Sequence, residues 1–120
     1  MEDTIYRETI LHHYKHPEYF GRLKNPDKTE TVLNPLCGDT LVIDIKEKDG
    51  KIVEIAWEGE GCAISQAAMS LVSGEIVGKN KNAILTLTIK DIYKLMGAQV
   101  SFLREKCAAL PLVGLKRLFK

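Results

Sequence analysis

Hydrophobic positions along the chain follow two different periods, and the change from one to the other predicts where helices and strands lie. Near the N-terminus the apolar positions that fall close to helical spacing are Ile5, Tyr6, Ile10, Leu11 and Tyr14. Asp3 is a suitable N-cap for this segment, and Pro17 disfavours helical backbone at His16. The chain is therefore predicted to begin with a helix of about ten residues that ends at His16.

The segment 17–35 has no sustained hydrophobic period. It carries several charges and two Asn-Pro steps, Asn25-Pro26 and Asn34-Pro35, which are typical of turns. We expect a long surface connection here, and structureless loops longer than about 12 to 15 residues are usually functional.

Alternating apolar and polar residues then replace the helical pattern. The apolar positions of the alternation are Leu41, Ile43 and Ile45 in one segment, and Val53, Ile55 and Trp57 in the next. Asp49-Gly50 between them is a preferred pair for a two-residue hairpin turn, because both positions require positive φ. These features predict an antiparallel hairpin, to which the glycine-rich segment 58–65 can add a brief third strand.

Three further helices are predicted in the C-terminal half. The first begins at a Ser65 N-cap and ends at Gly78, and the second lies between a Thr88 capping box and Gly97. A last helix ends the chain and carries Pro111 in its first turn, the part of a helix that tolerates proline. Strands in the middle with helices around them indicate an α+β fold, built as a single compact domain over residues 1–120.

Composition and charge exclude some classes of function. With 120 residues, of which 45% are hydrophobic, the chain has the size and apolar content of one domain with a real core. The 17 Lys and Arg residues nearly balance the 16 Asp and Glu residues, which leaves a formal charge of +1 and disfavours nucleic acid as a partner. No segment approaches the roughly 18 apolar residues of a membrane helix, and the acidic N-terminus differs from a signal peptide. We therefore expect a cytoplasmic protein without membrane contact.

Three cysteines and one aspartate are the candidates for chemistry. Cys37 and Asp39 flank Gly38, and residues i and i+2 of extended backbone point to the same side. A thiolate and a carboxylate can therefore converge there on one ion such as zinc. Cys62 precedes the second predicted helix and Cys107 the last one, where unpaired N–H groups favour a thiolate. The alternative for each cysteine is a small residue buried in the core, and an odd number of thiols argues against a disulfide framework.

Other candidates have simpler explanations. His12, His13 and His16 end the first predicted helix, where solvated or capping histidines are expected, and a metal site there lacks a nearby fourth ligand. Trp57 on the hairpin is expected in the core or in an interface.

The cysteines and the aspartate lie in three motifs, and a fourth segment adds to them. The segments are Asn34-Pro35-Leu36-Cys37-Gly38-Asp39, Gly59-Glu60-Gly61-Cys62-Ala63-Ile64-Ser65, Arg104-Glu105-Lys106-Cys107-Ala108-Ala109-Leu110 and the helix exit His13-Tyr14-Lys15-His16-Pro17. Together they resemble the U-type iron–sulfur cluster assembly scaffolds, the family of IscU, SufU and the N-terminal domain of NifU. The resemblance covers nearly the whole chain.

The resemblance implies a fold, a site and a function. The implied fold is a SufE/IscU-like α+β domain in which helices pack on a three-stranded antiparallel sheet. The implied ligands of a transient 2Fe-2S cluster, or of zinc in its place, are Cys37, Asp39, Cys62 and Cys107. Sulfur would arrive as a persulfide from a pyridoxal-phosphate cysteine desulfurase, with Cys37 or Cys107 as the acceptor. Iron would complete the cluster, which would then pass to apo iron–sulfur proteins.

Two roles agree with this resemblance. In the first, the protein is a non-enzymatic scaffold, monomeric or weakly homo-oligomeric, whose three thiolates and one harder carboxylate hold the cluster loosely enough for transfer. In the second, it is a SufU-like zinc-dependent sulfurtransferase. A structural zinc module unrelated to sulfur is a third alternative. Lys106 and the segment 101–105 stand where the IscU branch has a His and a Leu-Pro-Pro-Val-Lys segment, so a dedicated Hsp70-type chaperone is not expected as a partner.

Overall fold

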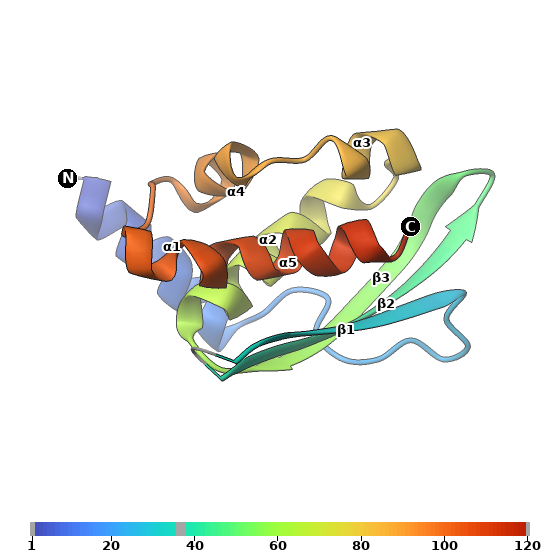
Figure 1. The fold of residues 1–120 in the computed structure, drawn as a ribbon, viewed down its shortest axis with the longest axis horizontal. Helices are drawn as coiled ribbons and strands as arrows, with labels where there is room; N and C mark the ends of the chain where they lie inside the picture. The colour runs from blue at the N-terminus through green and yellow to red at the C-terminus, as the bar shows by residue number, and fades with distance from the viewer. Residues whose placement is uncertain (1, 36–37, 120) are drawn as a thin grey trace.

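The structure is a computed structural model that describes residues 2–35 and 38–119, with side chains described from residue 7 onward. In chain order its elements are α1 (Glu2–Lys15), β1 (Lys28–Asn34), β2 (Asp39–Lys48), β3 (Lys51–Glu60), α2 (Ala63–Ile76), α3 (Lys81–Leu85), α4 (Ile89–Met96), the 3-10 turn η1 (Phe102–Arg104) and α5 (Glu105–Arg117). Figure 1 shows these elements from the side on which α5 lies in front.

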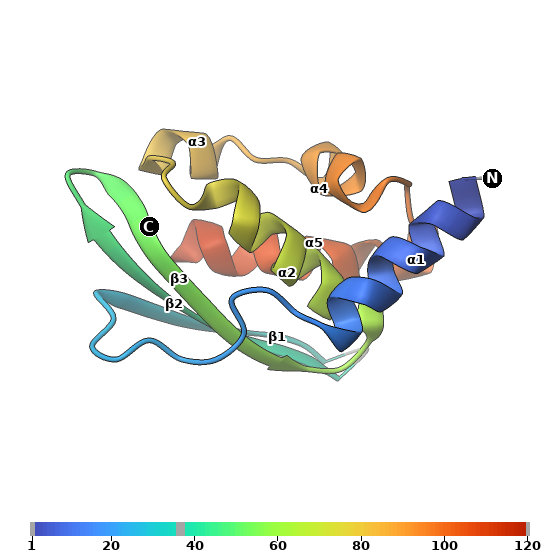
Figure 2. The same cartoon turned by 180° about the vertical axis from the view of Figure 1, so that it is seen from behind.

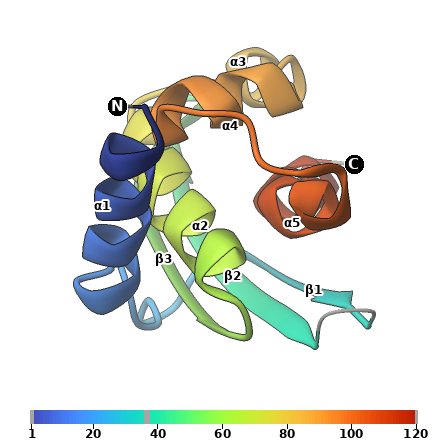
Figure 3. The same cartoon turned by 90° about the vertical axis from the view of Figure 1, so that its left-hand side faces the viewer.

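The molecule has two layers, a sheet and a set of helices. The strands follow the order β1-β2-β3, and both pairs are antiparallel. The view along the molecule shows all the helices on one side of the sheet (Figure 3). The predicted α+β class and its three-stranded antiparallel sheet are therefore confirmed.

The predicted hairpin is confirmed as β2 and β3. Asp49 and Gly50 both adopt positive φ, 53° and 78°, as a two-residue turn between twisted strands requires. Three apolar residues of β2 and Trp57 of β3 point toward the helices and are fully buried, the three in β2 being Leu41, Ile43 and Ile45. Trp57 is a core residue, and its indole N–H donates to the Glu18 carbonyl at 2.9 Å.

The sequence pattern indicated a third strand in the segment 58–65, but the third strand of the sheet is β1. Residues 58–60 only lengthen β3, whereas Lys28–Asn34 pairs along its whole length with β2. The strand is polar, and Val32 is its one buried hydrophobic residue, so the segment carries no apolar alternation. The pairing with β2 stabilises it as an edge strand, and a local pattern does not reveal such pairing.

All four predicted helices are present, as α1, α2, α4 and α5, and the structure corrects where some of them begin. The capping box at Thr88 and Asp91 is present, and Gly97 ends α4 in the left-handed conformation. The N-cap of α2 is Cys62 instead of Ser65. The short helix α3 was not predicted from the pattern, because five residues are too few to show a period.

The last helix begins earlier than predicted, because the prediction placed Pro111 in its first turn. Helix α5 starts at Glu105, so Pro111 lies in its interior and Cys107 lies in its first turn. Proline in a helix interior removes one intrahelical hydrogen bond, here the bond to the carbonyl four residues before it. That carbonyl belongs to Cys107.

The connection before β1 crosses the face of the sheet that the helices leave open (Figure 2). Tyr19 and Gly21 exchange backbone hydrogen bonds with Trp57 at 3.0 and 2.7 Å, and this makes a single parallel bridge at Phe20. Farther on, Arg22 forms an ion pair of 2.6 Å with the fully buried Asp44. The connection is thus ordered by the sheet. Within the described residues no helix has the length and apolar character needed to cross a membrane.

Candidate metal centre

Asp39 is held at the very start of β2, opposite Asn34 at the end of β1. Its side chain is buried at 1% exposure. The Oδ1 atom accepts a 2.7 Å hydrogen bond from the backbone N–H of Cys62. The Oδ2 atom is also buried and finds no hydrogen-bond partner among the described residues. A buried carboxylate oxygen without a partner is costly, and a bound cation would satisfy it.

Gly61 allows the aspartate and Cys62 to approach each other. It adopts a φ of +119°, and a Cβ atom on it would lie 2.7 Å from the Cα atom of Asp39. A side chain at this position would therefore push the two strand ends apart. The next residue, Cys62, has extended backbone as the N-cap of α2, and its side chain is half-buried. The glycine thus sets the geometry between the carboxylate and the second thiol.

Cys107 enters the site from the first turn of α5 and is fully buried. The side-chain amide of Asn34 donates to its Sγ atom at 3.9 Å. Asn34 itself is 6% exposed, so this N–H···S contact lies away from solvent. Hydrogen bonds to a ligand sulfur orient the thiolate and tune the metal that it binds.

The ligand atoms of Asp39, Cys62 and Cys107 all lie within 4.8 Å of one another. They come from β2, α2 and α5, whose relevant ends lie toward the same end of the molecule (Figure 1). Zinc–ligand bonds of about 2.0 to 2.3 Å would place two tetrahedral corners about 3.3 to 3.8 Å apart, so side-chain movements of about 1 to 1.5 Å would suffice. The predicted fourth ligand, Cys37, lies outside the described residues, between β1 and β2.

The donor set fits a thiophilic metal. Two thiols and one carboxylate, whose second oxygen is unsatisfied as far as the described residues go, match zinc, and iron–sulfur clusters favour the same thiolates. In the described part of the chain no other group of three metal-ligating side chains gathers as closely.

Sequence reasoning missed two residues of this site. Asn34 had been attributed to an Asn-Pro turn, and its contact with Cys107 links positions 73 residues apart. The sequence places Gly61 in a glycine-rich stretch and in the Cys62 motif, but it does not indicate what the glycine is for. Its positive φ becomes necessary only when β2 lies beside it.

The histidines at the end of α1 are not part of the one group of three metal-ligating side chains that gathers closely among the described residues. His12 and His16 are exposed, with ring centroids 5.5 Å apart. His13 is half-buried and its Nδ1 lies 2.7 Å from the Ser70 Oγ of α2. Burial lowers the pKa of His13, and the charge of Glu18 only partly offsets this effect. His13 therefore connects α1 to α2.

Comparison with known proteins gives close relatives. Residues 5–116 match the NifU-like N terminal domain family. The zinc-dependent sulfurtransferase SufU of Bacillus subtilis (strain 168) is 35% identical in an alignment 133 residues long. The alignment covers 96% of this chain and 89% of that protein. The iron–sulfur cluster assembly scaffold protein IscU of Streptococcus pyogenes serotype M1 is 34% identical over 92 residues, which cover 77% of this chain and 56% of that protein.

Solved structures share the fold. The crystal structure of a protein described as an iron–sulfur cluster assembly scaffold for the SUF system, from Fervidobacterium islandicum AW-1, superposes with a TM-score of 0.83. The two chains are 28% identical, and the superposition covers 98% of each. These comparisons confirm the resemblance that the sequence motifs indicated.

Proposed function

The chain belongs to the NifU-like N terminal domain family, and we propose that it is a scaffold that assembles a transient 2Fe-2S cluster and transfers it to apo-proteins. The observation that carries the proposal is the cluster of Asp39, Cys62 and Cys107, in which one buried carboxylate oxygen has no hydrogen-bond partner in the described part of the chain. A carboxylate is a harder ligand than thiolate, so a site containing it holds a cluster less firmly than four thiolates do. Such a site suits transfer better than permanent retention.

The sulfur source in this proposal is a pyridoxal-phosphate cysteine desulfurase that carries a persulfide. A thiolate of this chain attacks the outer sulfur of that persulfide, the donor's S–S bond breaks, and the donor cysteine leaves as a thiolate. Conversion of the transferred sulfur to sulfide takes two further electrons from an external reductant. Cys37 and Cys107 are the proposed acceptors, and with Asp39 and Cys62 they would complete the ligand set.

Burial decides how sulfur can reach Cys107. Its side chain is fully buried, so the first turn of α5 must open before a persulfide on another protein can approach it. Because Pro111 lacks an N–H, this turn lacks one of the hydrogen bonds that hold a regular helix together. The proline therefore lowers the cost of that opening.

The proposed setting follows from the same chemistry. Residues 1–120 would act as one domain, monomeric or weakly homo-oligomeric, and the reduced thiols suit the cytoplasm.

The second candidate function is a zinc-dependent sulfurtransferase. It is favoured by the 35% identity to the Bacillus subtilis sulfurtransferase SufU, which extends over 96% of this chain. In this role zinc would occupy the same ligands and one cysteine would receive sulfur without forming a cluster.

The deciding experiment is anaerobic reconstitution with a cysteine desulfurase, cysteine, iron and a reductant. The scaffold role predicts visible cluster absorption with iron and acid-labile sulfide in equal amounts. Single changes of Cys37, Cys62 or Cys107 to Ser should reduce both, whereas Glu75→Gln, a change on the exposed face of α2, should not.

The same samples separate the two roles. Bound zinc without sulfide, together with desulfurase stimulation that disappears when zinc is removed, would support the sulfurtransferase role in place of the scaffold. If labelled sulfur from the desulfurase never reaches this chain, both proposals are wrong.

A further inference from the structure

The outer face of the sheet is only partly covered. The connection 17–27 covers the row that contains Asp44, because Arg22 and the Leu23 N–H both bind that carboxylate. Two rows closer to the metal centre remain open, and their residues are Leu33, Thr40 and Glu60 in the first and Thr31, Val42 and Glu58 in the second. Leu33 is 62% exposed there.

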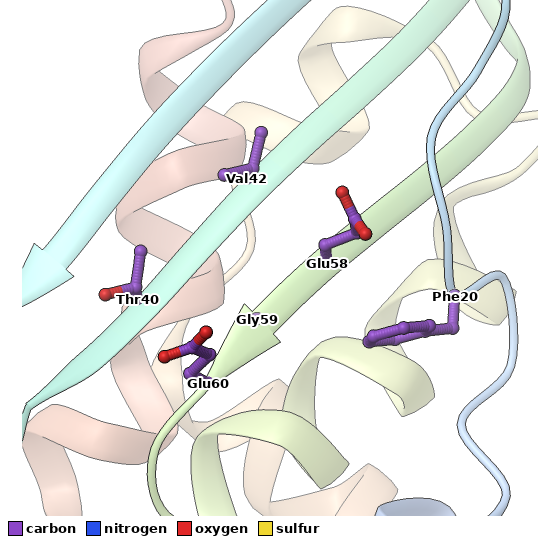
Figure 4. A pocket seen from close by; sticks show the side chains of 6 residues that line it. All are labelled: Phe20, Thr40, Val42, Glu58, Gly59 and Glu60. Carbon is purple, nitrogen blue, oxygen red and sulfur yellow. The ribbon is translucent and has the colours of Figure 1, made fainter.

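A hollow of about 430 Å³ lies over these rows, beside the end of β3. Its lining residues are Phe20, Thr40, Val42, Glu58, Gly59 and Glu60. Figure 4 shows Phe20 on the side of β3 that faces away from β2. The hollow thus combines an exposed aromatic ring and a valine with two carboxylates.

The two carboxylates have no cation of their own. Glu58 and Glu60 are exposed, and neither forms a salt bridge with any residue in the described parts of the chain. Arg22, whose charge interacts with Glu58, is already bound to Asp44. The hollow therefore offers negative charge to a positively charged occupant.

The edge of β3 beside the hollow has free hydrogen-bonding capacity. The N–H and carbonyl of Trp57 both bind the connection at Tyr19 and Gly21. Backbone groups two residues farther along a strand point to the same edge, so those of Gly59 also point away from β2. Within the described residues they form no hydrogen bond outside the sheet, because the connection has already turned away. An unpaired strand edge of this kind accepts an added strand.

We propose that an extended segment of a partner protein, containing lysine or arginine, adds to the edge of β3 at Gly59. Its backbone continues the parallel pairing that the connection begins at Trp57, and a cationic side chain lies between Glu58 and Glu60. Gly61 and Cys62 follow directly, so the bound segment brings its protein to the metal centre. The docking surface requires neither a cluster nor zinc, so it goes beyond the proposed function and can fail independently of it.

The test is a titration of the full ¹⁵N-labelled chain with a decapeptide that alternates lysine and valine. The expected result is a shift of the Gly59 amide resonance, accompanied by shifts at Phe20 and Glu60. Ion pairs between peptide lysines and the two carboxylates should contribute to the binding free energy. The double variant Glu58→Gln/Glu60→Gln should therefore raise the Kd about fivefold to tenfold. High salt should also raise the Kd, because it screens the attraction between the lysines and the two carboxylates.

Matched controls make the result specific. The double variant Glu8→Gln/Glu75→Gln changes the net charge equally at two exposed sites away from the hollow, and its Kd should equal that of the unmodified chain. A peptide with glutamate in place of lysine should not shift Gly59. Equal binding of that peptide, an unmoved Gly59 amide, or equal weakening by both double variants would overturn the proposal. Sedimentation that shows a dimer dissociated by Glu58→Gln/Glu60→Gln would also overturn it, by identifying a second copy as the occupant.

Discussion

At the scale of single residues, the site depends on how one carboxylate is shared. One Asp39 oxygen accepts a hydrogen bond from the Cys62 N–H, and the other is buried and has no hydrogen-bond partner among residues 2–35 and 38–119. The spacing Cys37-Gly38-Asp39 was enough to select the aspartate as a candidate ligand from the sequence. The roles of Asn34 and Gly61 were not predictable, because each depends on a residue that is distant along the chain.

Removal of the Asp39 carboxylate should slow cluster release. In Asp39→Ala the hardest ligand is absent, so a reconstituted cluster should persist longer and transfer to an apo-ferredoxin several-fold more slowly, measured by circular dichroism. Asp39→Asn is the control, because it keeps an acceptor for the Cys62 N–H while removing the charge. An unchanged or shorter transfer half-time in Asp39→Ala would contradict the assignment.

A methyl group at Gly61 should disrupt the site. Gly61→Ala must adopt a φ of +119° and place its Cβ against Asp39, so the free energy of unfolding should fall by about 2 to 4 kcal/mol. Urea denaturation measures this loss, and metal titration should show weaker binding. Gly74→Ala in α2 is the control, since its Cβ would only reach Tyr19 and Glu18 at 3.8 and 3.9 Å. Equal stability of the two variants would refute the argument.

At the scale of elements, the connection 17–27 shows how a segment without a pattern becomes ordered. Its backbone pairs with Trp57, and its Arg22 and Leu23 bind Asp44. Burial alone would raise the pKa of Asp44, but hydrogen bonds from Arg22, Thr29 and Leu23 and the charge of Arg22 outweigh it. The pKa of Asp44 therefore lies below its usual range, and the ionised carboxylate stabilises the fold.

The lowered pKa of Asp44 makes the free energy of unfolding depend on pH. The stabilisation is fully present above the unfolded carboxyl pKa of about 4 and is lost as pH falls through the lower folded pKa. Asp44→Asn should lower the free energy of unfolding by about 1 to 3 kcal/mol at pH 7 and flatten its acid dependence. Urea denaturation from pH 7 to pH 3 measures both. Asp49→Asn in the exposed hairpin turn should change stability by less than about 0.5 kcal/mol; equal losses in both variants would contradict the role of Asp44.

At the scale of the whole molecule, the candidate metal centre lies where the sheet meets two helices. Asp39, Cys62 and Cys107 lie at the starts of β2, α2 and α5, and their ligand atoms meet within 4.8 Å. Any metal bound there connects three elements that otherwise meet through packing and a few hydrogen bonds. Binding free energy at such a site adds to folding free energy.

Zinc loading should therefore raise thermal stability. Removal of zinc by a chelator should lower the Tm by about 5 °C or more, since a ligand at 1,000 times its Kd adds roughly 4 kcal/mol. Differential scanning calorimetry of the loaded and stripped protein measures the change. In Cys62→Ser the two preparations should differ much less, and the same difference in both proteins would show that zinc acts elsewhere.

The sequence by itself determined the α+β class, the hairpin, the capped helix α4 and the candidate ligands Asp39, Cys62 and Cys107. These features depend on periodicity, turn chemistry and residue type, which act within a few positions. Tertiary structure alone decided the strand β1, the interior position of Pro111 and the contact of Asn34 with Cys107. In each of these cases the stabilising partner lies on another element, and packing against that partner outweighs the local preference of the segment.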